Sequence, residues 1–252
     1  MYRILLVDDD SAIRYVYSKM KAWRECGFLI AAEASNGRDA LRLLQKEHFD
    51  LVLTDIRMPF VDGLALLREI KERGIDTFAI LVSSYNEFEY ARQGLILGAF
   101  DFIVKPVSEK SLTEALERAK IYLGEKRQNQ EISELILRVM EQLGVSMEQD
   151  SFLQRLCLYL TENMGQTLTM ENAAFNMNLN KDYFGKLVKQ HTGMSFHTLY
   201  ATIKMEYAKT LIKEGGYRNY EISDMLGYST PDYFAKIFKD ITGMTPTQYK
   251  NQ

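Results

Sequence analysis

The sequence predicts a doubly wound α/β domain with five parallel strands, followed by an all-α domain that contains two helix-turn-helix units. Three observations predict this fold class. Short apolar runs alternate with helical patterns through the first half, strand-like alternation is missing after residue 151, and one 13-residue pattern occurs twice in the second half. A chain of 252 residues is long enough for two domains that each bury a core.

The first half has a βαβα rhythm of five strands and five helices, which is typical of a parallel sheet covered by helices on both faces. The predicted elements are, in order, a strand over Arg3–Val7, a helix over Ser11–Glu25, a strand over Phe28–Ala34, a helix over Gly37–Glu47, a strand over Leu51–Thr54, a helix after Gly63, a strand over Phe78–Val82, a helix near Glu87–Leu97, a strand over Phe102–Val104 and a helix from Ser108.

The composition is that of a globular chain, with 46% hydrophobic and 26% charged residues. No run of 18 apolar residues is present, and Asp8 interrupts the first apolar run before a signal-peptide core could form, so we expect a cytoplasmic protein without a membrane partner. Cys26 and Cys157 are far apart and lack the spacing of a zinc site or a disulfide framework. We therefore expect two buried, reduced thiols.

Polar side chains follow four of the five predicted strands, where parallel α/β sheets bind their ligands. Asp8 and Asp9 follow the first strand, and Asp55, Ser83 and Lys105 follow the third, fourth and fifth. Three carboxylates that lie together repel one another unless a cation intervenes, and Mg²⁺ prefers such oxygen ligands. One aspartate could then accept a phosphoryl group, while the lysine and the serine hold its oxygens.

Each of these residues has an ordinary explanation when taken alone, because Asp after a strand often caps a helix and Lys before Pro often lies in a solvated loop. Their joint occurrence at strand ends is far less ordinary. The motifs LLVDDD, LTDIRMPFVDG, LVSSY and FIVKP resemble those of the receiver domain of two-component response regulators, which has a flavodoxin-like fold. The resemblance covers residues 1–123.

The resemblance implies that Asp55 accepts a phosphoryl group from a sensor histidine kinase. It further implies that Mg²⁺ is held by Asp8, Asp9, Asp55 and the backbone carbonyl of Arg57. Lys105 would contact the phosphoryl group.

By the same resemblance, Lys105 would precede a cis peptide bond to Pro106. Ser83 and Phe102 would be switch residues, whose side chains move when Asp55 is phosphorylated. Two residues depart from the family pattern, since Asp10 stands where Glu is usual and Phe60 stands where a small residue is common.

A rival interpretation is a haloacid-dehalogenase phosphatase, whose DxD opening resembles the run Asp8-Asp9-Asp10. That family needs a further acidic pair after its lysine, whereas Lys105 is followed by Pro-Val-Ser, and Asp55 would have no role.

Residues 124–150 form a predicted linker helix, with apolar residues at helical spacing from Ile132 to Leu143. Polar residues such as Lys126, Gln130 and Ser133 interrupt the possible coiled-coil seam. A dimer-forming helix and a helix that caps the next domain both remain open.

Residues 151–252 contain an internal repeat at an offset of 50 residues. The segments Asp182–Met194 and Asp232–Met244 agree at eight of thirteen positions. Each follows a shorter predicted helix, at Met170–Phe175 and Glu221–Leu226, so each unit reads as helix–turn–helix. Asn180 and Thr230 are expected N-caps, and Gly193 and Gly243 are expected to end the two second helices.

Within both second helices, aromatic and aliphatic residues such as Phe184 and Phe234 should face the core, while the lysines lie on the opposite face. Gly185 and Ala235 are predicted to lie on that outer face, where small residues let a helix approach a DNA groove. The predicted DNA-binding residues are Asn180, Lys181, Asp182, Lys186 and Lys189 in the first unit, and Thr230, Asp232, Lys236 and Lys239 in the second.

The arrangement resembles the AraC-type DNA-binding domain, most clearly over Ile222–Tyr249. Asn178 departs from it where Gly is frequent, and Lys204 where Arg is common. The expected connecting helix, Phe196–Glu214, would be about 28 Å long, which suits two recognition helices in successive major-groove turns about 34 Å apart.

A receiver joined to an AraC-type module resembles the YesN-like response regulators. The resemblance implies a transcription regulator that is not an enzyme, binds promoter double-stranded DNA, contacts RNA polymerase, forms a homodimer on phosphorylation and activates transcription. A receiver that signals only by protein contact, with the second domain as a scaffold, is the alternative.

Overall fold

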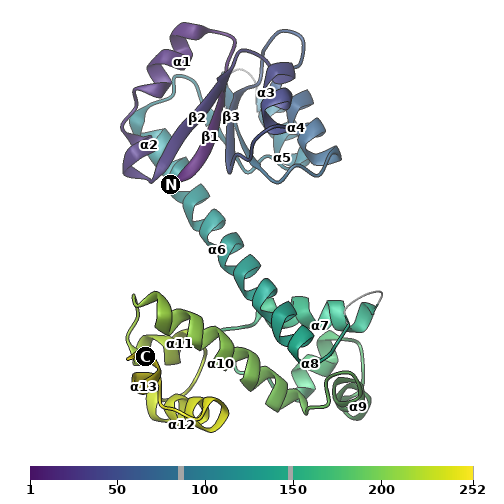
Figure 1. The fold of residues 1–252 in the computed structure, drawn as a ribbon. Coiled ribbons are helices and arrows are strands. Elements are labelled where there is room, and N and C mark those ends of the chain that lie inside the picture. Colours follow the sequence, from purple (N-terminus) through teal and green to yellow (C-terminus); the bar gives the residue numbers. More distant parts are fainter. Residues whose placement is uncertain (85–87, 147–149, 252) are drawn as a thin grey trace. The chain divides into compact units, whose positions relative to one another are not determined.

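The computed structural model describes residues 1–84, 88–146 and 150–251. It divides the chain into two compact units, Met1–Glu125 and Lys126–Gln252. The first is an α/β unit and the second is helical (Figure 1).

The first unit is built on one parallel sheet of five strands in the order β2-β1-β3-β4-β5, which confirms the predicted fold class. Every neighbouring pair is parallel, and β1 lies between β2 and β3. The strands are β1 (Tyr2–Val7), β2 (Phe28–Ala34), β3 (Leu51–Asp55), β4 (Phe78–Ser83) and β5 (Asp101–Val104).

Helices cover both faces of this sheet because alternate strand residues point to opposite faces. On one face, Leu6 and Leu53 pack with Trp23 and Leu116 from the helices, and on the other Leu5 packs in a separate cluster with residues of α3 and α4. The helices of this unit are α1 (Ser11–Ser18), α2 (Ala22–Glu25), α3 (Gly37–Leu44), α4 (Gly63–Glu72), α5 (Phe88–Leu97) and the first part of α6 (Glu109–Gln142). Glu87, expected to begin α5, lies outside the described residues.

The single helix predicted over residues 11–25 is wrong, because the structure breaks it into α1 and α2. The Glu109 carboxylate accepts hydrogen bonds from the backbone N–H groups of Lys21 (3.0 Å) and Ala22 (3.2 Å). The Trp23 indole N–H donates to the Tyr17 carbonyl at 2.7 Å. The distant Glu109 and the nearby Trp23 satisfy backbone groups at the break, and the local apolar pattern reveals neither contact.

Helix α6 is continuous from Glu109 to Gln142, so the last receiver helix and the predicted linker helix are one element. Its second part belongs to the core of the helical unit, where Ile132, Ile136 and Met140 are at most 3% exposed. Leu137, four residues after Ser133 and therefore on the same coiled-coil seam, is 43% exposed. Of the two alternatives, the structure therefore favours the helix that caps the following domain.

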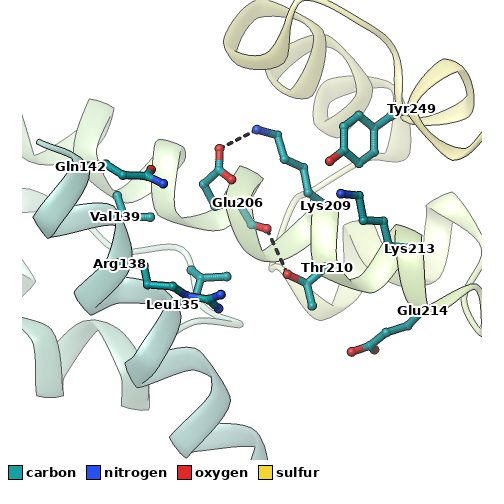
Figure 2. Close-up of a pocket in the computed structure, with 10 residues that line it drawn as sticks. All are labelled: Leu135, Arg138, Val139, Gln142, Glu206, Lys209, Thr210, Lys213, Glu214 and Tyr249. Carbon is teal, nitrogen blue, oxygen red and sulfur yellow. Dashed lines mark hydrogen bonds and ion pairs between the residues drawn. The ribbon is translucent and has the colours of Figure 1, made fainter. Parts of the chain in front are cut away.

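A groove lies between the second part of α6 and α10 (Phe196–Glu214), as Figure 2 shows, with a volume of about 420 Å³. Two of its cations are already engaged, because Lys209 pairs with Glu206 at 2.6 Å and Lys213 lies over the Tyr249 ring at 5.6 Å. The groove thus marks where the second part of α6 lies beside α10.

The helical unit contains both predicted helix-turn-helix units, joined by α10, whose bounds agree with the prediction. The first unit is α8 (Met170–Asn176) and α9 (Lys181–Thr192), and the second is α11 (Asn219–Met225) and α12 (Pro231–Thr242). Helices α7 (Ser151–Glu162) and α13 (Pro246–Lys250) complete the described elements.

The predicted helix limits are present in both repeats. The side chains of Asn180 and Thr230 accept hydrogen bonds from backbone N–H groups of α9 and α12, and Gly193 and Gly243 have positive φ angles of 72° and 82°. Asn178, the residue after the C-cap of α8, also has a positive φ of 55°. This left-handed backbone explains why Asn can replace the more frequent Gly at that position.

Gly63→Ala should lower the free energy of unfolding by about 1–3 kcal/mol, because the new methyl group would overlap the backbone at Asp55 and lie 3.0 Å from Ile56 Cα. Urea unfolding measures this loss. Gly124→Ala is the matched control, since its Cβ would meet only the Tyr2 hydroxyl at 3.9 Å and a helical Ala should stabilise slightly. Equal stability of Gly63→Ala and wild type would contradict the close approach.

Candidate functional site

The five polar residues predicted at the strand ends meet at the carboxyl edge of the sheet. Asp8 and Asp9 directly follow β1, Asp55 and Ser83 are the last residues of β3 and β4, and Lys105 directly follows β5. Because β1 and β3 are neighbours, their two aspartates are brought together without any further element.

The chain turns sharply after Asp8, and hydrogen bonds hold this turn. The Asp8 carboxylate accepts the Asp10 N–H at 2.9 Å, while the Asp10 carboxylate caps α1 by accepting from Ala12 at 2.8 Å. The Arg14 guanidinium donates to the Asp8 carbonyl at 2.7 Å. Asp10, a departure from the family pattern, thus begins a helix.

Asp8, Asp9 and Asp55 each offer a carboxylate oxygen, and these oxygens lie within 4.8 Å of one another. Asp8 and Asp55 are buried, with 2% and 8% exposure, whereas Asp9 is exposed. The Lys105 ammonium lies 3.0 Å from Asp55 Oδ2 and 3.3 Å from Asp8 Oδ2. One ammonium therefore pairs with two of the three clustered carboxylates, which leaves negative charge for a second cation.

Burial and charge act against each other on these groups. Burial raises the pKa of Asp55, the Lys105 ammonium lowers it and nearby Asp8 raises it, so the pKa stays above its usual value. For Lys105, burial lowers the pKa, but the ion pairs with Asp55 and Asp8 outweigh burial and hold the pKa above its usual value. Lys105 therefore stays charged beside the two carboxylates.

The other predicted receiver residues surround this cluster. Ser83 is 2% exposed, and its backbone carbonyl accepts the Lys105 N–H at 2.7 Å. The Lys105–Pro106 peptide bond is cis. Phe102 is 37% exposed, so its ring lies at the surface in this structure. Arg57 lies two residues beyond Asp55, with its guanidinium 5.4 Å from the centroid of the Tyr90 ring.

A cavity of about 410 Å³ opens beside the cluster, and Asp9 is the member of the cluster that lines it. Its lining residues are Asp9, Ile56, Arg57, Met58, Pro59, Asp62 and Tyr90. Phe60, in the same loop, has a positive φ of 69° and is 78% exposed, with the Arg38 guanidinium over its ring at 5.2 Å. A small residue would be less strained there, and Phe60 leaves the cavity open because it points to solvent.

The donor set fits Mg²⁺, which takes one or two carboxylates and keeps its remaining ligands as water, carbonyl or phosphate oxygens. The ammonium, together with a cation held by the carboxylates, could balance the charge of a phosphoryl group, and a carboxylate oxygen of the cluster could attack it.

The helical unit presents its predicted DNA-binding residues at the surface. The ten residues 181–190 and the ten residues 231–240 follow the same sequence of exposed, half-buried and buried positions, with Phe184, Val188, Phe234 and Phe238 fully buried. The exposed residues of the predicted set are Asn180, Lys181, Asp182, Lys186 and Lys189, and Thr230, Asp232, Lys236 and Lys239. Lys181 forms an ion pair with Glu171.

The prediction for Gly185 is wrong, because its missing side chain faces α8 and not the outer surface. A Cβ at Gly185 would lie 3.1 Å from Met170 Sδ. The small residue is thus explained by packing within the helix-turn-helix unit.

Two aromatic residues on the exposed face are not among the predicted DNA-binding residues. Tyr183 and Tyr233 occupy equivalent positions of α9 and α12 and are 50% and 51% exposed. They belong to the repeated Asp-Tyr-Phe sequence, and only the adjacent Phe is buried. The presence of Tyr at the same position of both repeats could have indicated that these residues belong to the DNA-binding face.

Family models match both units. The response regulator receiver domain matches residues 4–117, and a helix-turn-helix domain matches residues 173–252. The chain is a response regulator that combines a receiver domain with an AraC-type helix-turn-helix DNA-binding domain, a class of transcription regulator.

The relatives that match along the whole chain include a response regulatory protein and a transcriptional regulatory protein. An uncharacterised response regulatory protein of Staphylococcus epidermidis is 25% identical over 252 residues, covering 100% of this chain and 99% of the relative. The transcriptional regulatory protein HptR of Staphylococcus aureus is 26% identical over 253 residues, with 100% and 99% covered.

Two solved domains of AraT, a response regulator from Geobacillus stearothermophilus, are also similar. Its receiver domain is 29% identical with a TM-score of 0.47, covering 50% of this chain and 98% of that one. Its C-terminal domain is 31% identical with a TM-score of 0.40, covering 41% and 87%.

Two further findings bear on the sequence expectations. Cys26 and Cys157 are both free and buried, as expected, and burial raises the pKa of Cys157 to about 11. Among the described residues, no helix has the length and apolar character needed to cross a membrane.

Asp55→Asn should raise the free energy of unfolding at neutral pH. The folded-state pKa of Asp55 lies above its unfolded value, so in the wild type stability is lost as the pH rises from the unfolded pKa through the folded pKa. The gain from Asn should disappear below the unfolded pKa. Urea unfolding of both proteins from acidic to neutral pH measures this gain in free energy. If the variant is no more stable than wild type at neutral pH, the inference that the folded state disfavours the charged form of Asp55 is wrong.

Proposed function

We propose that this chain is a DNA-binding transcriptional response regulator of a two-component system, phosphorylated on Asp55 by a sensor histidine kinase. The observation that supports this best is the Lys105 ammonium, within 3.3 Å of both Asp55 and Asp8 at the edge of the sheet. This ammonium balances part of the charge of the clustered carboxylates, and it lies where a further negative group that binds at this edge could also contact it.

In the proposed reaction, a carboxylate oxygen of Asp55 attacks the phosphorus atom of the donor. The bond from phosphorus to the kinase histidine nitrogen breaks, and its electron pair stays on the imidazole. Mg²⁺, held by Asp8, Asp9, Asp55 and the Arg57 carbonyl, would supply positive charge for the phosphoryl oxygens.

The chain's own residues then hold the product. Lys105 binds one phosphoryl oxygen, and the Ser83 hydroxyl, at the neighbouring strand end, turns toward another. Phe102, now at the surface, moves inward as Ser83 is drawn away. The receiver surface around β4 and β5 would thereby change shape.

The change would act on DNA binding and on assembly. Two phosphorylated chains would form a homodimer, which raises the local concentration of helix-turn-helix units at one promoter. Contact with RNA polymerase would then activate transcription, and promoter DNA as the target places the protein in the cytoplasm.

The two alternatives are less well supported. For a phosphatase, Asp8 would be the nucleophile, yet it is 2% exposed and already bonded to the Asp10 N–H and to Lys105. Turnover of a phosphomonoester would favour that activity. A scaffold role would not require exposed lysines at matching positions of both α9 and α12.

Incubation with a small phosphodonor and Mg²⁺ should add one phosphoryl group to the wild type, and Asp55→Ala should abolish the adduct. Asp240→Asn, on the exposed face of α12, is the control and should react like wild type. Removal of Mg²⁺ with a chelator should also prevent the reaction, because the phosphoryl charge is then opposed by three carboxylates. Intact-mass spectrometry measures each, and an adduct that survives Asp55→Ala would end the proposal.

Lys186→Ala and Lys236→Ala should each weaken DNA binding about tenfold and reduce the dependence of affinity on salt by about one counterion. Both should leave phosphorylation unchanged. The control is Lys213→Ala, whose side chain lies in the groove beside α6 (Figure 2). Fluorescence anisotropy with DNA that the wild type selects from a random pool measures the affinity. Unchanged binding of both variants would remove α9 and α12 as recognition helices.

A further inference from the structure

The two helix-turn-helix units meet at a junction beside α10. The loop before α8, residues 163–168, belongs to the first unit, and the turn after α11, residues 225–228, belongs to the second. The hydroxyl of Thr167 donates to the Gly227 carbonyl at 2.9 Å, which bonds the loop to the turn directly.

The loop and the turn approach so closely that side chains are excluded. A Cβ at Gly165 would lie 2.9 Å from the Met225 carbonyl oxygen, and one at Gly227 would overlap the Gly165 carbonyl. Gly227 also has a positive φ of 68°. The two backbones are thus in contact, and a small shift of one unit must move the other.

Lys204 of α10 bonds both sides of this junction. Its side chain is 4% exposed, and its ammonium donates to the Gln166 carbonyl of the loop and to the Leu226 carbonyl of the turn, both at 2.6 Å. Leu226 is the C-cap residue of α11, where the helix end has negative partial charge. One cation therefore ties the first unit to the second.

Aromatic contacts extend this link to the recognition helix α12. The Lys204 ammonium lies 4.4 Å from the Tyr200 ring centroid and 5.2 Å from that of Tyr228. Tyr228 in turn packs against Tyr233, with ring centroids 5.9 Å apart, and against Phe234 at 5.8 Å. Tyr233 is the exposed tyrosine of α12, so the junction reaches the face proposed to meet DNA.

The buried positive charge of Lys204 costs free energy, because no carboxylate pairs with this ammonium among the residues that the structure describes. Burial lowers its pKa to about 8, which means that folding opposes the charged form. A methionine of similar length would avoid this cost. The ammonium therefore needs an explanation other than stability, and the two carbonyl bonds that it makes across the junction provide one.

We propose that Lys204 is a positioning residue for DNA binding, which fixes the placement of α12 relative to α9 so that one chain recognises two half-sites at a single spacing. The inference rests on the proposed binding of DNA by both units. Lys204 acts through the junction and makes no contact with DNA in this scheme.

The test compares DNA duplexes of different spacing. Wild-type protein first selects a two-half-site duplex from a random pool, and derived duplexes then have two base pairs inserted between the half-sites, or one half-site scrambled. Affinities are measured for wild type, Lys204→Met and Lys204→Arg. Because two base pairs rotate one half-site away from its recognition helix, the wild type should lose at least about tenfold in affinity on insertion.

Lys204→Met should bind the selected duplex about tenfold more weakly than wild type. Its affinity should fall less than about threefold when two base pairs are inserted, and its affinity for the single half-site should stay within about threefold of the wild-type affinity. Lys204→Arg should restore the spacing preference, since it offers a cation with several donors. Thr167→Val, in the exposed loop, should also weaken the preference for the selected half-site spacing. It replaces Lys204→Met in the test if Lys204→Met does not fold.

A spacing preference unchanged in a folded Lys204→Met, or in Thr167→Val when Lys204→Met does not fold, overturns the inference. The inference is also overturned if Lys204→Met loses as much affinity for the single half-site as for the selected duplex, because that would indicate general damage to the fold. Failure of the wild type to select any DNA would instead refute the proposed function on which the inference rests.

Discussion

The shared contact of Lys105 with Asp55 and Asp8 is the constraint on which the receiver unit depends. Two carboxylates at the ends of adjacent, buried strands cannot both stay charged at such short range without a cation. The sheet order brings β1 beside β3, and Lys105, which follows β5, reaches both aspartates with its long side chain. Sheet topology and charge balance therefore specify the same edge of the sheet.

The helical unit differs, because it contains two similar exposed surfaces, one on α9 and one on α12, within one folded unit. Repetition of sequence reproduces the pattern of burial in α9 and α12, so each helix buries its aromatic face and exposes its lysines. Repetition alone does not set the angle between the copies. The contacts at the junction of Gly165, Gly227 and Lys204 belong to no repeat, and we propose that they help to set this angle.

The elements and the polar residues at the strand ends could be predicted because they follow local rules. Apolar runs predict strands. Asn180 and Thr230 predict helix starts, because their side chains can accept hydrogen bonds from backbone N–H groups of the first turn. What failed depended on distant partners. The break between α1 and α2 needs Glu109, 88 residues beyond Lys21, and the reason for Gly185 is a methionine on another helix. The bonds of Lys204 likewise come from segments 38 and 22 residues away.

Helix α6 has a consequence for how this chain can be divided into fragments. Its second part contributes Ile132, Ile136 and Met140 to the same core as α10, although the family match of the helical region begins only at residue 173. A fragment cut at residue 151 would expose part of that core to water and aggregate readily. Transplantation of the DNA-binding module onto another sensor domain should therefore retain the chain from about residue 126, the first residue of the second unit.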